Sequence, residues 1–179
     1  KFIMDYEALL LSGISLSLTN HIAQTLIDDS SRISSFFRFV YHKNPTISWR
    51  AAWVMAKVQE KKPELLSPFI PKIIEAVPTL THPGTKRSFL TILDKTELQD
   101  GIPVSLINSC FDWILSPRES IACRALCIRI LYKVCRMEPD FIPELRACLE
   151  NINMNDSKGM RAAARNTLNA LNRIKRTQE

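Results

Sequence analysis

Apolar residues along the chain recur with the spacing of one helix face, and this spacing returns in four separate segments. In each segment, the residues three, four and seven positions after the first apolar residue are also apolar. The quartets are Ile33, Phe36, Phe37 and Val40; Ile70, Ile73, Ile74 and Val77; Ile107, Cys110, Phe111 and Ile114; and Leu145, Cys148, Leu149 and Ile152. Because this pattern places four side chains on one side of an α-helix, each quartet predicts an amphipathic helix.

A second helix is predicted in each repeat, around an arginine that recurs every 37 residues. The arginines are Arg50, Arg87, Arg124 and Arg161, and a small residue follows each of them. We expect helix N-caps before them, at Thr46 or Ser48, at Thr85, and at Asp156 or Ser157. The quartet helices are expected to carry a proline in the opening turn, where a missing amide proton costs no helical hydrogen bond. These prolines are Pro71, Pro103 and Pro143.

Paired helices of this kind predict an all-α fold. The units span approximately residues 12–44, 45–81, 82–116 and 117–154, and residues 155–179 form a final capping helix. One pair cannot bury its own apolar face, so we expect a right-handed α-solenoid of about four and a half antiparallel helix pairs. Residues 1–179 should form a single domain with one continuous core. Its two expected columns are Ile33, Ile70, Ile107 and Leu145, and Phe37, Ile74, Phe111 and Leu149.

The unit length, the prolines before the arginine helices and the repeated arginine resemble HEAT repeats, which form armadillo-type helical stacks. More specifically, these features resemble short free-standing bacterial HEAT-like proteins, and the resemblance covers roughly residues 30–175. Such a resemblance implies a fold and not a ligand. HEAT repeats often carry an aspartate before the arginine that links neighbouring units. Here the position five before the arginine holds Pro45, His82, Glu119 and Asp156, so only the last two units keep an acid.

Composition adds to this picture mainly by exclusion. The chain has 179 residues, of which 46% are hydrophobic and 23% charged, with only four glycines, as expected of a helical globular protein. The longest uncharged stretch, residues 8–27, is too polar to cross a membrane, and no secretory signal is evident, so we expect a cytoplasmic location. Five cysteines without a C-x-x-C pair predict reduced, buried thiols rather than disulfides or a zinc site.

The segment WRAAW places an arginine between two tryptophans that share a helix face. This arrangement suits either a ligand site or a packing seam, and we favour the seam. Trp53 should be mostly buried between the first two units, because its column continues as Leu90, Cys127 and Ala164. Arg50 should reach a backbone carbonyl or a carboxylate. Trp49 should be half exposed, which makes it a candidate for contact with a partner.

Charge is distributed unevenly along the chain. Residues 1–117 hold 12 basic and 11 acidic residues, whereas residues 118–179 hold 12 and 7. The exposed column of the quartet helices should be Arg38, Glu75, Asp112 and Glu150. The final helix carries Lys158, Arg161 and Arg165 and no acid, so it either caps the stack or docks an acidic partner or nucleic acid. The recurring arginines should be structural, although regular guanidiniums also suit a polyanion.

The sequence lacks the motifs of phosphate-binding loops, serine hydrolases and zinc peptidases, and its three histidines lie in different segments. We therefore expect no catalytic, metal or cofactor-binding residues. The leading functional hypothesis is a monomeric, non-enzymatic scaffold or adaptor that binds a protein or peptide partner. The alternative is a nucleic-acid binder related to the HEAT-like DNA alkylation-repair glycosylases. The candidate partner-binding residues are Trp49, Glu75, Asp112, Glu150, Lys158, Arg161 and Arg165.

Overall fold

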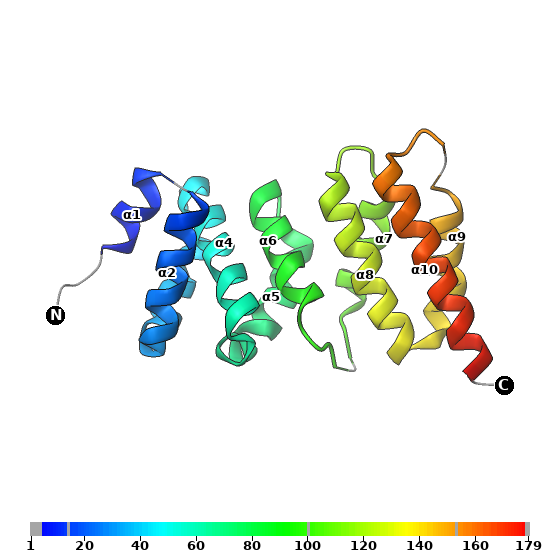
Figure 1. Ribbon diagram of the computed structural model, residues 1–179, viewed down its shortest axis with the longest axis horizontal. Coiled ribbons are helices and arrows are strands. Elements are labelled where there is room, and N and C mark those ends of the chain that lie inside the picture. Colours follow the sequence, from blue (N-terminus) through cyan, green and yellow to red (C-terminus); the bar gives the residue numbers. More distant parts are fainter. Residues whose placement is uncertain (1–4, 14, 100, 153, 178–179) are drawn as a thin grey trace. The chain divides into compact units, whose positions relative to one another are not determined.

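The protein is helical throughout the part described by the computed structural model, which covers residues 5–13, 15–99, 101–152 and 154–177 (Figure 1). The predicted all-α fold is confirmed. Contacts are concentrated in two compact units, unit 1 (residues 1–96) and unit 2 (residues 97–179). Among the described residues, no helix combines the length and the apolar character needed to span a membrane.

Unit 1 consists of longer helices joined by short ones. The α-helices are α1 (Tyr6–Ser12), α2 (Leu16–Asp28), α3 (Ile33–Phe37), α4 (Pro45–Lys61), α5 (Ile70–Ala76) and α6 (Pro83–Asp94). The 3-10 turns are η1 (Ser30–Arg32), η2 (Arg38–Tyr41), η3 (Pro63–Leu65), η4 (Ser67–Phe69) and η5 (Val77–Thr79). Helix α4 packs against α2 on one side and α6 on the other, so these three helices form one layer.

Unit 2 has fewer helices, and they are arranged in two layers. It contains α7 (Val104–Leu115), α8 (Ile121–Met137), the turn η6 (Pro139–Phe141), α9 (Ile142–Glu150) and α10 (Lys158–Thr177). Helices α8 and α10 lie side by side, and α7 and α9 lie behind them in Figure 1. In unit 2, the arginine helices α8 and α10 therefore form one layer and the quartet helices α7 and α9 form the other.

The predicted core columns hold best in unit 2. Ile107, Phe111, Leu145 and Leu149 are all buried there. In unit 1, Ile33 and Phe37 are buried, but Ile70 and Ile74 are only partly buried. Prolines interrupt that segment, leaving α5 only seven residues long between 3-10 turns, so the quartet does not form one continuous helical face.

The helix N-caps differ from those expected. Asn44 caps α4, His82 caps α6 and Ser120 caps α8, each through a side-chain acceptor. The predicted caps at Thr46, Ser48 and Thr85 are wrong, whereas Ser157 accepts a hydrogen bond from the Met160 amide at the start of α10, as predicted. His82 escapes a search for caps because histidine is not among the usual cap residues. Its ring nitrogen Nδ1 accepts from the amides of Gly84 and Thr85.

Candidate functional site

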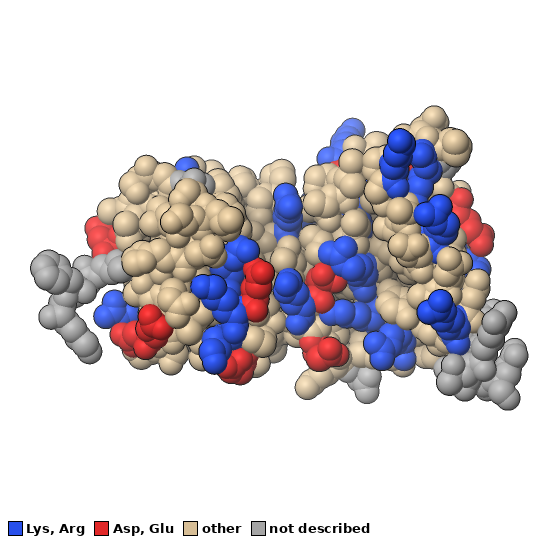
Figure 2. Space-filling view, viewed as in Figure 1, with Lys and Arg blue, Asp and Glu red and all other residues tan. Residues whose placement is uncertain are grey.

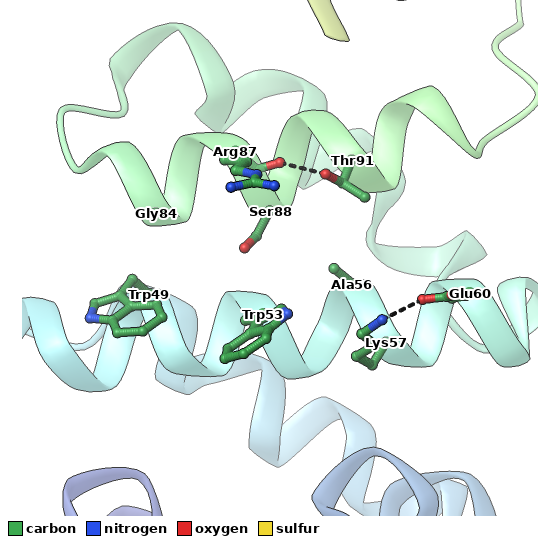
Figure 3. A pocket seen from close by; sticks show the side chains of 9 residues that line it. All are labelled: Trp49, Trp53, Ala56, Lys57, Glu60, Gly84, Arg87, Ser88 and Thr91. Atoms are coloured by element: carbon green, nitrogen blue, oxygen red, sulfur yellow. Dashed lines mark hydrogen bonds and ion pairs between the residues drawn. The ribbon is translucent and has the colours of Figure 1, made fainter. Parts of the chain in front are cut away.

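A cavity of about 480 Å³ lies between α4 and α6, within unit 1 (Figure 3). Helix α4 contributes Trp49, Trp53, Ala56, Lys57 and Glu60, and helix α6 contributes Gly84, Arg87, Ser88 and Thr91. Small residues at Ala56, Gly84 and Ser88 leave room that larger side chains would fill where the helices pack. A cavity of this size suits one or two side chains of a ligand.

The two tryptophans present neighbouring aromatic surfaces to this cavity. Their rings are nearly parallel, with centroids 6.2 Å apart and 19° between the planes, which is an offset stack. Both side chains are partly buried. Packing between neighbouring helices, the predicted role of Trp53, accounts for only part of its surroundings, because the rest of the residue lines the cavity.

The close approach of α6 to α4 depends on Gly84. A Cβ atom added there would lie 3.1 Å from Cε1 of His82 and 3.3 Å from Cβ of Trp49. This closeness lets the His82 ring lie nearly parallel to Trp49, with centroids 6.3 Å apart and 12° between the planes. The residue that caps α6 therefore also holds the aromatic wall of the cavity in place.

Arg50 points away from the cavity and is structural, as predicted. Its Nη1 donates a hydrogen bond of 2.6 Å to the carbonyl oxygen of Leu10, which lies in α1. The guanidinium carbon lies 5.6 Å from the centre of the Trp49 ring, within the range of a cation–π contact. Arg50 thus connects α4 to α1 and supports one side of Trp49.

Two other recurring arginines are also structural. The Nε of Arg124 donates to the carbonyl oxygen of Ile114 over 2.7 Å, and its Nη1 forms an ion pair of 2.8 Å with Asp156. Arg161 donates to the carbonyl oxygens of Met154 and Asp156. The acid kept at Asp156 therefore links α8 to the start of α10, a contact of the kind that the resemblance to HEAT repeats implies.

Arg87 is the exception in this series. Its side chain is exposed and lines the cavity, and it has no hydrogen bond or ion pair with any residue in the part of the chain that the structure describes. The structural role expected of this arginine does not hold. Figure 3 shows its guanidinium on the α6 side of the cavity, across from the α4 tryptophans.

The helix caps explain why Arg87 differs. Arg124 lies four residues after its cap, Ser120, but Arg87 lies five after His82. Successive residues of a helix point in directions about 100° apart. The position four residues after the cap, which Arg124 occupies in α8, is therefore occupied in α6 by the buried Lys86, and Arg87 points in a different direction. In α4 the same position is Ser48, which donates to the carbonyl oxygen of Val40 much as Arg124 donates to that of Ile114.

Of the charged side chains that line the cavity, Lys57 and Glu60 neutralise each other. Lys57 and Glu60 form an ion pair of 2.7 Å, and this hydrogen bond lowers the pKa of the Glu60 carboxyl. The Thr91 hydroxyl donates to the carbonyl oxygen of Arg87 over 2.8 Å. With Lys57 and Glu60 paired, the positive charge of Arg87 is available to an anionic group placed beside two aromatic rings.

The other predicted contact residues lie outside this cavity. Glu75 is exposed on α5 of unit 1, and Asp112 and Glu150 are exposed on α7 and α9 of unit 2. Arg38, which heads the same expected column, is exposed as well. On α10, Lys158 and Arg165 are exposed, while Arg161 is partly buried and bound to carbonyls. The structure thus brings Trp49 together with Trp53 and Arg87, and with none of the other candidates.

The cysteines behave as apolar fillers. All five are free and buried. Burial raises the pKa of Cys135 to about 12 and that of Cys148 to about 11, which keeps both thiols protonated at neutral pH. Within the described residues, no group of three or more histidine, cysteine or acidic side chains is arranged to hold a metal ion.

Comparison with protein families matches this chain to a HEAT repeat domain over residues 6–171. The match includes all of α2 to α9 and therefore the whole cavity between α4 and α6. Comparisons with curated proteins and with solved structures give no match.

Proposed function

Because the chain belongs to the HEAT repeat family, we propose that it is a non-enzymatic adaptor that binds a peptide segment of a partner protein in the cavity between α4 and α6. Stacked helix pairs offer extended surfaces on which a partner can lie. The observation that carries the proposal is the exposed, unpaired Arg87 beside Trp49 and Trp53. Tryptophan and arginine are the residue types that most often dominate binding energy at protein interfaces.

The lining indicates the chemistry of the peptide. The ring faces of Trp49 and Trp53 favour an apolar or aromatic side chain, which would lose contact with water on entering the cavity. Arg87 favours a carboxylate, because a guanidinium binds a carboxylate through two parallel hydrogen bonds. We therefore expect a segment in which an aromatic or large aliphatic residue is adjacent to an acidic residue or to a C-terminal carboxylate.

Selection of peptides from a random library tests this proposal on the complete chain. Enriched peptides should share the apolar and acidic pair. Trp53→Ala should weaken their binding by at least ~30-fold, the usual effect of removing an aromatic hot spot. Arg87→Gln should weaken it by about 10-fold or more, because a charge-assisted hydrogen bond is lost.

A matched control uses the surface of the quartet helices. Arg38→Gln and Glu75→Gln alter exposed charges of unit 1 that lie outside the cavity, and both should leave peptide affinity unchanged. Peptides that bind equally well to Trp53→Ala and Arg87→Gln but lose affinity for Glu75→Gln would place the ligand on the quartet helices and refute the proposed site.

A further inference from the structure

Helices α8 and α10 of unit 2 form a surface without acidic residues. Neither Ile121–Met137 nor Lys158–Thr177 contains an aspartate or glutamate. The two helices contact each other along one layer of the unit, so their outer sides form one continuous face. Figure 2 shows lysine and arginine side chains gathered over this face, whereas basic and acidic side chains alternate over unit 1.

Exposed cations come from both helices. We name as the basic face Arg129 and Arg136 of α8 together with Lys158, Arg165 and Arg173 of α10, all of which are exposed. Arg124 and Arg161 of the same helices are partly buried and hold the fold together instead. The cations of the basic face are therefore exposed to solvent, unlike the partly buried Arg124 and Arg161 beside them.

The opposite layer of unit 2 has the opposite charge. Helices α7 and α9 expose Asp112, Glu144 and Glu150. Their single basic residue, Arg146, donates a hydrogen bond to Asn172 of α10. Unit 2 is thus basic on one side and acidic on the other, a separation that directs an approaching polyanion to the α8 and α10 side.

From this arrangement we propose that the basic face binds the phosphate backbone of a nucleic-acid duplex without reading its sequence. Seven residues separate Arg129 from Arg136 and Lys158 from Arg165. At 1.5 Å per residue, each helix therefore presents two charges about 10 Å apart. Neighbouring helices are packed about 8–10 Å apart, so the face presents a spread of positive charge in two dimensions. A duplex, with rows of phosphates on two strands, matches this spread.

The absence of apolar anchors on this face favours a duplex over other polyanions. An acidic protein partner normally inserts an aromatic or aliphatic anchor at the centre of the interface. Within the described part of α8 and α10, the only exposed large apolar side chain is Ile121, at the first residue of α8. No aromatic side chain on these helices is exposed for bases of a single strand to stack on, since Tyr132 is partly buried. The exposed amides of Asn166 and Asn169 can donate to phosphate oxygens.

Fluorescence anisotropy of a labelled duplex of about 20 base pairs with the complete chain tests this proposal. Binding should weaken steeply between about 50 and 200 mM salt, because phosphate contacts release counterions. The triple variant Arg136→Gln, Lys158→Gln and Arg165→Gln should weaken binding at least ~10-fold at the lower salt. It should also reduce the slope of log K against log salt by about 2 to 3, roughly one for each phosphate contact removed.

The control removes the same charge from exposed positions of unit 1, through Arg38→Gln, Lys43→Gln and Lys72→Gln. This variant should retain affinity within about threefold and keep the salt slope. Equal weakening by both triple variants would mean that only net charge matters and would overturn the proposal. Tighter binding to polyglutamate or to the single strand than to the duplex would overturn it as well. Parallel DNA and RNA duplexes show which double helix is preferred.

Discussion

At the scale of single residues, the stability lost on substitution depends on how deeply the side chain is buried. Helix α7 offers two contrasting positions. Phe111 is 8% exposed and Leu115 is 51% exposed. Phe111→Ala should lower the free energy of unfolding by about 3–5 kcal/mol, whereas Leu115→Ala should change it by less than about 0.5 kcal/mol. Urea denaturation of both variants measures the difference. Similar losses for the two would contradict the placement of Phe111 in the core of unit 2.

The buried thiols predict a loss of stability in alkali. Cys135 and Cys148 have pKa values raised to about 12 and about 11 by burial, above the value of 9.0 for an unperturbed thiol. The folded state therefore keeps protons that the unfolded state loses, so stability that is present below about pH 9 is lost as the pH rises toward 11 or 12. Melting temperature should fall over this range, and less steeply in Cys148→Ala. Rapid alkylation of both thiols in the folded protein at pH 8 would contradict their burial.

The residues of the cavity show where the sequence stops being informative. A spacing of four residues is enough to place Trp49 and Trp53 on one face of a helix. Whether that face is packed or open depends on the small residues opposite, Gly84 and Ser88, which come from another helix. Only the packing of α4 on α6 brings them together, so the spacing of the tryptophans predicts a partly buried aromatic face but not the cavity that this face lines.

At the scale of helices, the recurring arginines separate into two kinds. Arg124 is largely buried and paired with Asp156, so Arg124→Gln should lower the free energy of unfolding by about 2 kcal/mol or more, because it removes the guanidinium that bonds the Asp156 carboxylate and the Ile114 carbonyl. Arg87→Gln should change stability by less than about 0.5 kcal/mol, because the side chain is exposed and unpaired. Thermal denaturation of both variants tests this difference. Equal losses of stability in the two variants would contradict this distinction. They would indicate that Arg87 has the same structural role as Arg124, as the regular spacing of 37 residues suggests.

The helices themselves were predictable, and their exact starts were not. The quartets and prolines indicated the helix pairs, because apolar periodicity reports directly on burial. Helix rotation depends on the cap, and the successive caps Asn44, His82, Ser120 and Ser157 are 38, 38 and 37 residues apart. When the repeats are aligned on the prolines that follow Asn44 and His82, and not on the arginines, the sequence shows the one-residue shift that exposes Arg87.

At the scale of the whole molecule, the two compact units predict where proteases act. Lys95 is exposed just after α6, at the boundary between the units, and Glu97 and Gln99 beyond it are exposed and non-helical. Limited digestion with trypsin should therefore cleave after Lys95 before it cleaves within α4 or α8, where cleavage requires local unfolding. Mass spectrometry of the first fragments identifies the site. Early cleavage within α4 or α8 would contradict the division into these units.

The proposed binding surfaces lie in different units, the cavity in unit 1 and the basic face in unit 2. Each can therefore be altered by substitutions that leave the other unit's residues untouched. Trp53→Ala should leave duplex binding unchanged, and the triple variant of the basic face should leave peptide binding unchanged. Loss of both activities in either variant would indicate damage to the fold rather than to a surface.

Acrylamide quenching of tryptophan fluorescence distinguishes an open ligand site lined by Trp49 and Trp53 from a packed seam. In Trp113→Phe the two cavity tryptophans provide all of the signal. We expect acrylamide to quench this fluorescence in the free protein and a selected peptide to protect it, with protection lost in Arg87→Gln at the same peptide concentration. Fluorescence that resists acrylamide in the free protein, or quenching that the bound peptide leaves unchanged, would contradict this expectation and return WRAAW to a packing seam.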